Sequence, residues 1–456
     1  MIDDTIAAIA TPLGEAGLAI IRLSGPAALE IADRCFQPAA KPGIKPSAAT
    51  SHTIHFGHIV HKGQIVDEVL LSVMHAPRTF TREHAIEITC HGGMLPAKLV
   101  LEAVLISGAR LAEPGEFTRR AFLNGRLDLA QAEAVADLIH SRTELALRAA
   151  NEQLAGKLSR RINELRDQAL KILAHVEAHI DFPEEDIAPA TRAQLVARLE
   201  DSIRYMDDLL RTADEGQILR RGIRAAIVGR PNAGKSSLLN QLLGRDRAIV
   251  SAIPGTTRDT IEETANIRGL PVIFIDTAGL REARDEIELE GIRRGRESLS
   301  NAEFILHVFD ASESFIAADQ TFLTEFATKK RILVRNKIDL QSKLEIPALL
   351  NTSVVDVCCL TGQGIEQLKE AIKGLAWSGE LRAEMLEVMI NSRHQDALQR
   401  ARAALLRTVE ALRREETLEL VALDLRIGIN AIGEIVGKTT TEDLLDVIFS
   451  QFCIGK

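Results

Sequence analysis

The stretch DTAGLREARDEIE, residues 276–288, raises a chemical question. Its first four residues follow the pattern D-x-x-G of GTP-hydrolysing switches, in many of which the next residue is a glutamine that orients the attacking water. Here the next residue is Leu280, whose side chain cannot hold water. A hydrolase built on this pattern needs another group to place the water and a cation to neutralise the phosphates.

A phosphate-binding loop precedes this stretch. The sequence GRPNAGKS, residues 229–236, follows a β-like run and opens a helical one. Gly229 and Gly234 let backbone N–H groups close around phosphates. The Lys235 amine reaches the β- and γ-phosphate oxygens, and the Ser236 hydroxyl binds Mg²⁺ at the helix N-terminus. The loop predicts binding of a nucleoside triphosphate.

The later segment VRNKIDL indicates which base is read. The Asp339 carboxylate can accept hydrogen bonds from N1–H and the exocyclic amine of guanine, whereas adenine would present a lone pair. The sequence therefore predicts GTP rather than ATP. A further loop on the guanine side usually reads Ser-Ala-Lys, but residues 358–360 are Cys-Cys-Leu. A backbone N–H of this loop can still contact the guanine oxygen, and its effect on affinity stays open.

The segment PGTTRD lies between the phosphate loop and Asp276, and its Thr257 is the expected switch threonine for Mg²⁺. A simple β-turn around Pro254 is compatible with this role. Asp276 is expected in the magnesium shell and Gly279 at the γ-phosphate. The predicted GTP-binding residues are Asn232, Ala233, Gly234, Lys235, Ser236, Ser237, Ser251, Ala252, Ile253, Pro254, Gly255, Thr256, Thr257, Asp276, Thr277, Ala278, Gly279, Asn336, Lys337, Ile338 and Asp339.

The hydrophobic patterning predicts the elements that position these residues. Short runs rich in Ile, Val and Thr predict an N-terminal α+β domain, and apolar residues at three-to-four spacing predict helices after it and again near the C-terminus. Between the helical stretches, alternating strands and helices are typical of a doubly wound parallel sheet. This order predicts an α/β domain inserted into a helical one. The predicted domains are residues 1–118, residues 119–218 together with 380–456, and residues 219–379.

Composition excludes several classes of protein. The 456 residues are 46% hydrophobic and 26% charged, as in soluble globular proteins. The sequence has neither an apolar run of membrane-spanning length nor an export signal, so we expect a cytoplasmic protein. Five cysteines without a C-x-x-C pair predict free thiols. The net charge of −9 requires that any RNA contact use local basic surface. The candidate patches, residues 117–126, 158–163 and 219–224, are otherwise ordinary solvated faces.

With these residues in view, the chain resembles the MnmE (TrmE) family of tRNA-modifying GTPases from end to end. The resemblance rests on the stretches GRPNAGKSSLLN, PGTTRD, DTAGLREA, PGEFTRRAFLNGRLDLAQAEAVADLI and the terminal FCIGK. It implies an N-terminal tetrahydrofolate-binding domain that also mediates homodimerisation, a central helical domain and an inserted Ras-like G domain. It also implies that the enzyme acts with the flavoprotein MnmG. Together they add an aminomethyl or carboxymethylaminomethyl group to C5 of the wobble uridine U34 of certain tRNAs.

The family's site residues carry over by their positions in these motifs. Asn232 would ligate K⁺ with backbone carbonyls of Ser251, Ile253 and Thr256, and this cation would do the electrostatic work of an arginine finger, worth roughly 10³ to 10⁵ in rate. Glu288 would orient the water; the other acidic residues after Leu280 are more simply a solvated charge run. Lys235 and Cys453 complete the predicted catalytic set.

A 5,10-methylene- or 5-formyl-tetrahydrofolate would supply the one-carbon unit. The implied folate-binding residues are Arg22, Glu87, Arg126 and Lys456. Arg126 stands where the family commonly has lysine, and the charge is kept. Cys453 is a candidate for a role near the reacting carbon, with a small buried helix residue as the equal alternative.

Two other functions remain as alternatives. A ribosome-assembly switch of the Era type would share the nucleotide motifs, but the sequence shows nothing like the RNA-binding appendix of such a protein. A stand-alone folate-dependent transferase would leave the phosphate loop unexplained.

Overall fold

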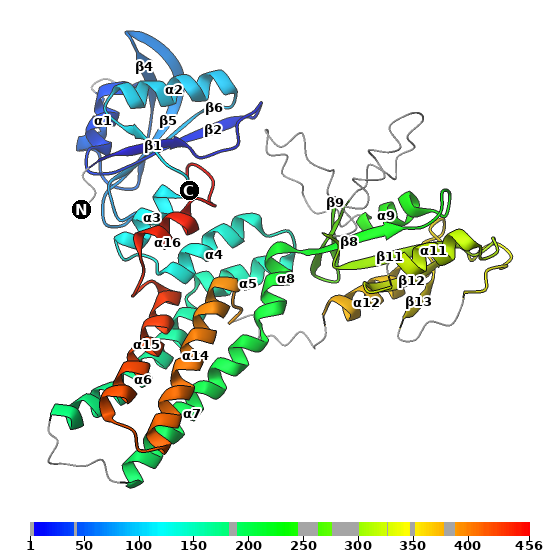
Figure 1. The fold of residues 1–456 in the computed structure, drawn as a ribbon. Coiled ribbons are helices and arrows are strands. Elements are labelled where there is room, and N and C mark those ends of the chain that lie inside the picture. The colour runs from blue at the N-terminus through cyan, green and yellow to red at the C-terminus, as the bar shows by residue number, and fades with distance from the viewer. Residues whose placement is uncertain are drawn as a thin grey trace. The chain divides into compact units, whose positions relative to one another are not determined.

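The computed structural model describes residues 4–40, 43–181, 189–244, 263–275, 301–325, 327–346, 352–377 and 388–456. The chain divides into two compact units, each assembled from separate stretches of sequence (Figure 1). Met1–Ala136, Ser159–Val196 and Ala403–Lys456 make up the first unit, and Asp137–Leu158 and Ala197–Arg402 the second. Within the described residues, no helix combines the length and the hydropathy that crossing a bilayer requires.

A seven-stranded sheet in the order β3-β4-β5-β6-β2-β1-β7 forms the N-terminal part of the first unit. Neighbouring strands are antiparallel, apart from the parallel pair β1 and β7. Apolar residues of alternate positions pack with the helices α1 (Ala28–Cys35) and α2 (Met94–Ile106) in one buried core. The strands are β1 (Ile6–Ile9), β2 (Leu18–Ser24), β3 (Phe36–Pro38), β4 (Thr53–His61), β5 (Gln64–Met74), β6 (Ala85–His91) and β7 (Arg110–Leu111). This arrangement confirms the predicted α+β class.

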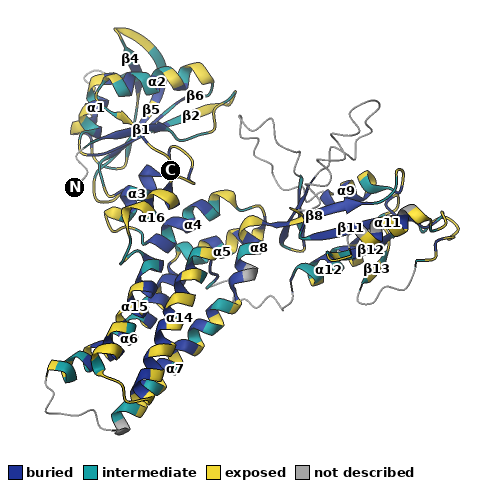
Figure 2. Cartoon of the chain, viewed as in Figure 1, coloured by how far each residue is buried: buried dark blue, intermediate teal, exposed yellow. Residues whose placement is uncertain are grey.

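The other face of this sheet exposes large apolar side chains. Leu18, Ile54 and Phe56 are 62%, 68% and 50% exposed, and the exposed residues colour parts of β2 and β4 yellow in Figure 2. The strand register places Leu70 opposite Phe56, which makes the apolar surface continuous across β4 and β5. Because successive side chains of a strand point to opposite faces, the same strands supply both the buried core and this open face.

Helices make up the remainder of the first unit. Asp128 and Gln131 exchange hydrogen bonds of 2.9 and 3.0 Å at the start of α4, an arrangement like a capping box. Thr441 caps the last helix by accepting from Leu444 N. The helices of this unit, some of which extend into the second, are α3 (Glu116–Leu123), α4 (Leu129–His140), α6 (Lys157–Asp181), α7 (Pro189–Arg211), α14 (Ser392–Arg413), α15 (Leu418–Val436) and α16 (Glu442–Phe449).

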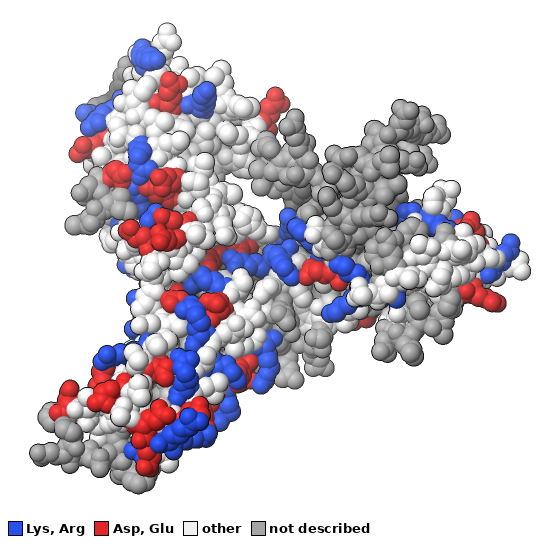
Figure 3. All heavy atoms as spheres, viewed as in Figure 1, with Lys and Arg blue, Asp and Glu red and all other residues white. Residues whose placement is uncertain are grey.

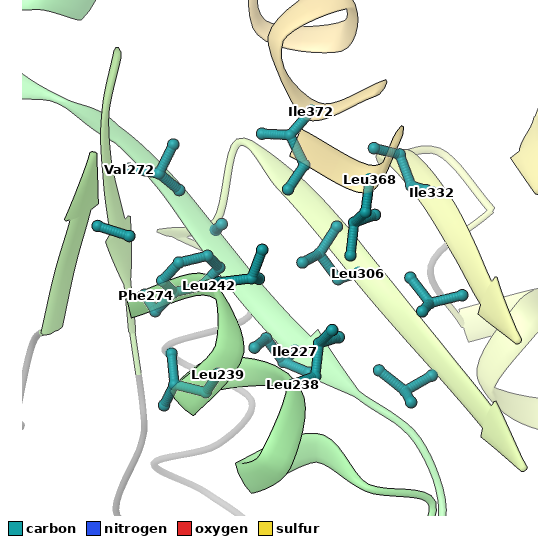
Figure 4. Close-up of a cluster of buried hydrophobic side chains, with 14 of the residues drawn as sticks. Ile227, Leu238, Leu239, Leu242, Val272, Phe274, Leu306, Ile332, Leu368 and Ile372 are labelled. Carbon is teal, nitrogen blue, oxygen red and sulfur yellow. The ribbon is translucent and has the colours of Figure 1, made fainter. Parts of the chain in front are cut away.

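The second unit contains a six-stranded sheet in the order β13-β12-β11-β8-β10-β9. All neighbours are parallel except β9 and β10, which form a hairpin. Leu238 and Leu242 of α9 and Leu368 and Ile372 of α12 pack against the sheet in one core (Figure 4). The strands are β8 (Ile223–Val228), β9 (Glu263–Ile267), β10 (Leu270–Phe274), β11 (Phe304–Asp310), β12 (Lys330–Asn336) and β13 (Ser353–Asp356). The helices are α5 (Glu144–Leu154), α8 (Ala213–Arg221), α9 (Lys235–Leu243), α11 (Ala317–Glu325) and α12 (Ile365–Ala376). The predicted doubly wound parallel sheet is confirmed.

Arg120 of α3 is the largest fully buried side chain of the described residues. Its guanidinium contacts carboxylate oxygens of Asp4 at 2.6 Å, Glu116 at 3.0 Å and Glu83 at 3.2 Å. Burial by itself raises the pKa values of Asp4 and Glu116, but hydrogen bonds from arginines outweigh it and hold both below their usual range. This network joins the N-terminus, the loop before β6 and α3.

Replacing this buried cation gives a first prediction. We expect Arg120→Met to lower the free energy of unfolding of the surrounding region by about 3 kcal/mol, because Glu83 and Glu116 lose a fully buried cation, although Arg110 still pairs with Glu116. This loss of unfolding free energy should be complete above the ordinary carboxyl pKa of about 4. It should decrease as the pH falls through the lower pKa values that these carboxylates have in the folded protein. Hydrogen exchange of α3 amides in urea measures it. Arg34→Met, which removes an exposed ion pair with Glu30 and an exposed hydrogen bond to the Ser107 carbonyl oxygen, should cost about 1 kcal/mol or less when read from α1 amides; equal costs would contradict the assignment.

Candidate functional site

The phosphate loop connects the end of β8 to the start of α9, at the carboxyl edge of the parallel sheet. Gly229 approaches β11 so closely that a Cβ there would lie 2.2 Å from the Val308 carbonyl oxygen. Gly234 has φ +96°, and its Cβ would lie 2.1 Å from Asn336 Nδ2. Both glycines are required by the backbone geometry, as their places in the motif predicted.

Lys235 begins α9 and folds back over the loop. Its Nζ donates to the Arg230 carbonyl oxygen at 2.7 Å, and burial lowers the pKa of Lys235. Ser236 and Ser237 follow in the exposed first turn of α9, where backbone N–H groups and the helix dipole favour an anion. Asn232 stands on the loop with φ +61° and an exposed side chain. The described half of the triphosphate site therefore has the arrangement of a phosphate cradle.

Asn336, at the end of β12, joins two loops. Its side-chain Nδ2 donates to the Ala233 carbonyl oxygen at 2.9 Å, and its Oδ1 accepts from the Cys359 backbone N at 3.2 Å. Only 2% of Asn336 is exposed. One amide thus connects the phosphate loop to the loop predicted on the guanine side.

Asp339 contacts the Cys-Cys-Leu loop through a thiol. Cys358 Sγ lies 3.1 Å from Asp339 Oδ1 and donates to it. Burial raises the pKa of the Cys359 thiol to about 11, so this thiol is protonated at neutral pH. Leu360 is 86% exposed. The sequence motif identified Asp339 but contained no signal for the Cys358 contact, because the usual pattern has no cysteine there.

Several predicted nucleotide-site residues lie outside the described residues. These are Ser251, Ala252, Ile253, Pro254, Gly255, Thr256, Thr257, Asp276, Thr277, Ala278, Gly279 and Glu288. Their roles stay predictions.

A second cluster of predicted residues lies in the first unit. Arg22 of β2 and Glu87 of β6 are register partners, and Arg22 Nε and Nη2 both lie 2.8 Å from Glu87 Oε1. Arg22 Nη1 donates to the Gly455 carbonyl oxygen at 3.3 Å, which brings the C-terminus to the sheet. The pKa of Lys456 is lowered by burial and by the charge of Arg22, with Glu87 acting in the opposite direction. Cys453, in the same terminal segment, is exposed and lies after the end of α16, so the alternative of a small buried helix residue is wrong.

Arg126 has a separate set of partners. Its Nη1 donates to the Thr79 carbonyl oxygen at 2.7 Å, and its guanidinium carbon lies 5.0 Å from the centre of the Phe80 ring. A shared ligand site of Arg126 with Arg22 and Glu87 stays a prediction.

The candidate basic patches differ from one another in the structure. Arg120, in the first, is fully buried; Arg161, in the second, pairs with Glu164; and Arg221, in the third, pairs with Glu303. On the face drawn in Figure 3, Lys and Arg are interspersed with Asp and Glu over the helices α6, α7 and α14. These contacts favour the interpretation as ordinary solvated or structural charge.

Comparison with known proteins decides the family. The model of the MnmE helical domain matches residues 129–453, and that of the GTP-binding protein TrmE N-terminus matches residues 5–126. The chain belongs to the MnmE family. The curated tRNA modification GTPase MnmE of Thermoanaerobacter sp. (strain X514) is 44% identical over 462 residues, 100% of each chain. The MnmE-family relative from Geobacillus thermodenitrificans (strain NG80-2) is 47% identical, with 99% of each chain covered. Among solved structures, the G domain of the T. maritima FeoB iron transporter is 28% identical over 34% of this chain and 98% of that one, with a TM-score of 0.26.

The close approach of Gly234 to Asn336 gives a second prediction. Gly234→Ala should weaken GDP and GTP binding at least tenfold, because the new Cβ meets a buried amide that is bonded on both sides and the backbone has positive φ. Calorimetric titration with GDP measures this. Gly374→Ala in α12, where a Cβ would have open space, is the matched control and should leave affinity unchanged. Normal affinity of Gly234→Ala would show that the loop opens in solution.

Proposed function

We propose that this chain is a potassium-dependent GTPase that acts with MnmG to add an aminomethyl or carboxymethylaminomethyl group to C5 of U34 in certain tRNAs. The observation that carries the proposal is the pairing of a preformed phosphate loop and guanine-side loop, joined by Asn336, with a family match over the full chain. The full-length match favours this function over the Era-type switch considered from sequence.

The nucleotide site would hold two kinds of cation. Ser236, with Thr257, would hold Mg²⁺, and the exposed Asn232, with carbonyls of Ser251, Ile253 and Thr256, would hold K⁺. Oxygen ligands suit both ions. A monovalent cation beside the phosphates supplies positive charge where an arginine finger would otherwise act. In this chain Lys235 contributes a second positive charge, and its lowered pKa reflects the burial of its amine.

Water placement would fall to Glu288, since Leu280 cannot orient water. Its carboxylate would hold the nucleophile, directly or through a second water. Asp276 and Gly279 would contact the magnesium shell and the γ-phosphate.

The cluster of Arg22, Glu87 and Lys456 has the donor set that a reduced folate needs. A carboxylate binds the amide and amidine edge of a pterin, and cations bind its glutamyl carboxylates. Glu87 is held by Arg22, which in turn contacts the C-terminal backbone at Gly455. The folate supplies the one-carbon unit when bound. Arg126 and Cys453 are proposed to complete this site.

The exposed apolar face of the N-terminal sheet supports a homodimer. Ile54 and Phe56 of β4 and Leu70 of β5 form the kind of exposed apolar surface that monomers rarely leave in water. Register partners across the sheet place Glu87 and Arg22 on the same face as Ile54, so the proposed folate site would lie beside the dimer contact. The domain ranges 1–118, 119–218 with 380–456, and 219–379, and the cytoplasmic location, are part of the same proposal.

Loss of the gene gives a third prediction. Bulk tRNA from a deletion strain should lack the aminomethyl-type modifications at U34, as read by mass spectrometry of nucleosides. A plasmid copy of the chain should restore them, whereas a copy carrying Gly234→Ala should restore less, because its GTP binding is weakened. Unaltered U34 in the deletion strain would disprove the proposal.

Cation exchange gives a fourth prediction. Replacing KCl by NaCl at equal ionic strength should lower the GTP turnover of the full chain at least tenfold, since Na⁺ is too small for the proposed carbonyl cage. The Asn232→Ala variant should show the slow rate in both salts. Equal wild-type rates in the two salts would remove K⁺ from the mechanism while leaving the GTPase assignment intact.

A further inference from the structure

Arg230, the second residue of the phosphate loop, has side-chain partners that the motif does not explain. Its Nε lies 3.0 Å from Asp319 Oδ1, and its Nη1 lies 3.0 Å from Glu313 Oε2. Its Nη2 also donates to the Ser314 carbonyl oxygen at 3.3 Å. All these partners belong to residues 313–319, which include the end of the β11–α11 connection and the first turn of α11. One short segment therefore holds the guanidinium on several sides.

The two carboxylates on Arg230 differ in burial. The Asp319 side chain is 1% exposed, whereas that of Glu313 is 56% exposed. Asp319 uses its second oxygen, Oδ2, to accept from the Ile316 backbone N at 3.1 Å, at the start of α11. A buried carboxylate that lost its cation would be costly, whereas an exposed ion pair contributes little. Asp319 is therefore the partner that fixes Arg230.

The backbone of Arg230 in turn organises the phosphate loop. Its carbonyl oxygen accepts from Lys235 Nζ at 2.7 Å and from the Ala233 backbone N at 3.3 Å. A shift of this peptide would displace the lysine that reaches the phosphates and the turn that carries Gly234. Arg230 therefore connects the two: its side chain is held by Asp319, and its carbonyl oxygen positions Lys235.

The same segment also contacts the guanine end of the site. Asp310, where β11 ends, accepts from Lys337 Nζ at 2.6 Å, and the Ala311 backbone N donates to the Asn336 carbonyl oxygen at 2.8 Å. Residues 310–319 therefore connect the phosphate loop to residues 336–339, the segment that contains Asn336, Lys337 and Asp339. Asp310 is the link at the guanine end and Asp319 the link at the phosphate end.

We propose that Asp319 is a positioning residue for triphosphate binding, acting through Arg230 on the phosphate loop. This inference rests on the proposed GTPase function. The loop contacts the phosphates in both the ground state and the transition state. Loosening it should therefore raise the KM for GTP, and displacement of the catalytic Lys235 should lower kcat as well.

The test is steady-state GTP hydrolysis by the full chain in KCl and Mg²⁺, with Asp319→Asn against Glu313→Gln. We expect Asp319→Asn to raise KM about tenfold and to lower kcat by a smaller factor, and Glu313→Gln to change KM and kcat less than twofold. The ratio of kcat/KM for GTP and ITP should stay at the wild-type value in both variants, since Asp339 reads the base independently. A KM of Asp319→Asn within twofold of wild type would overturn the inference.

A double-mutant cycle separates positioning from a purely structural role of Asp319 as the cap of α11. Arg230→Gln alone leaves that cap intact and should reproduce the tenfold rise in KM, even if Asp319→Asn proves unstable. Adding Asp319→Asn to it should raise KM less than twofold further. If the KM increases of the two single variants multiply in the double variant, Asp319 acts through α11 and not through Arg230. A wild-type chain without GTP hydrolysis would instead overturn the proposed function itself, together with the inference.

Discussion

The nucleotide site depends on the buried amide of Asn336, which bonds the phosphate loop at Ala233 and the guanine-side loop at Cys359. The strands that lead to these loops are not all neighbours, because β11 lies between β8 and β12 in the sheet. Parallel strands bring their carboxyl ends to one edge but do not bring their loops into contact. The short Asn336 side chain, which has both a donor and an acceptor, makes the hydrogen bonds that link the two loops. The absence of a side chain at Gly234 makes room for it.

Charge in the structure is balanced locally. Lys337 pairs with Asp310, Arg230 with Asp319 and Arg22 with Glu87, so the cations near both candidate sites are held in defined positions. Such pairs contribute geometry more than stability, because each charge must first be desolvated. Lys235 differs, since its Nζ donates to the Arg230 backbone carbonyl oxygen and burial lowers its pKa. A neutral acceptor holds the lysine without competing for its charge, which suits a group that must bind phosphate.

The first unit shows how distant parts of a chain form one site. Arg22 and the Gly455 carbonyl oxygen are separated by 433 positions in sequence and lie 3.3 Å apart. Gly455 has φ +91°, and a Cβ there would lie 2.7 Å from the Ile9 carbonyl oxygen, so the terminal segment packs against β1 only as glycine. The C-terminal helix α16 packs near α4 in one apolar cluster, which delivers this segment to the sheet. The proposed folate site therefore requires both ends of the chain to fold together.

The sequence alone determined the fold class and the phosphate loop and predicted Asp339 as the guanine reader, because glycine spacing, strand alternation and the Asn-Lys-x-Asp pattern are local and follow from backbone geometry and hydrogen bonding. It also indicated Arg22 and Glu87, through family resemblance. Tertiary structure alone decided that Arg120 of a basic stretch is buried among three carboxylates, that Cys358 supports Asp339, and that Asp319 holds Arg230. Apart from Arg120 and Glu116, which are four residues apart on α3, these pairs join residues from different elements, and only packing of the strands and loops brings such side chains within hydrogen-bonding distance.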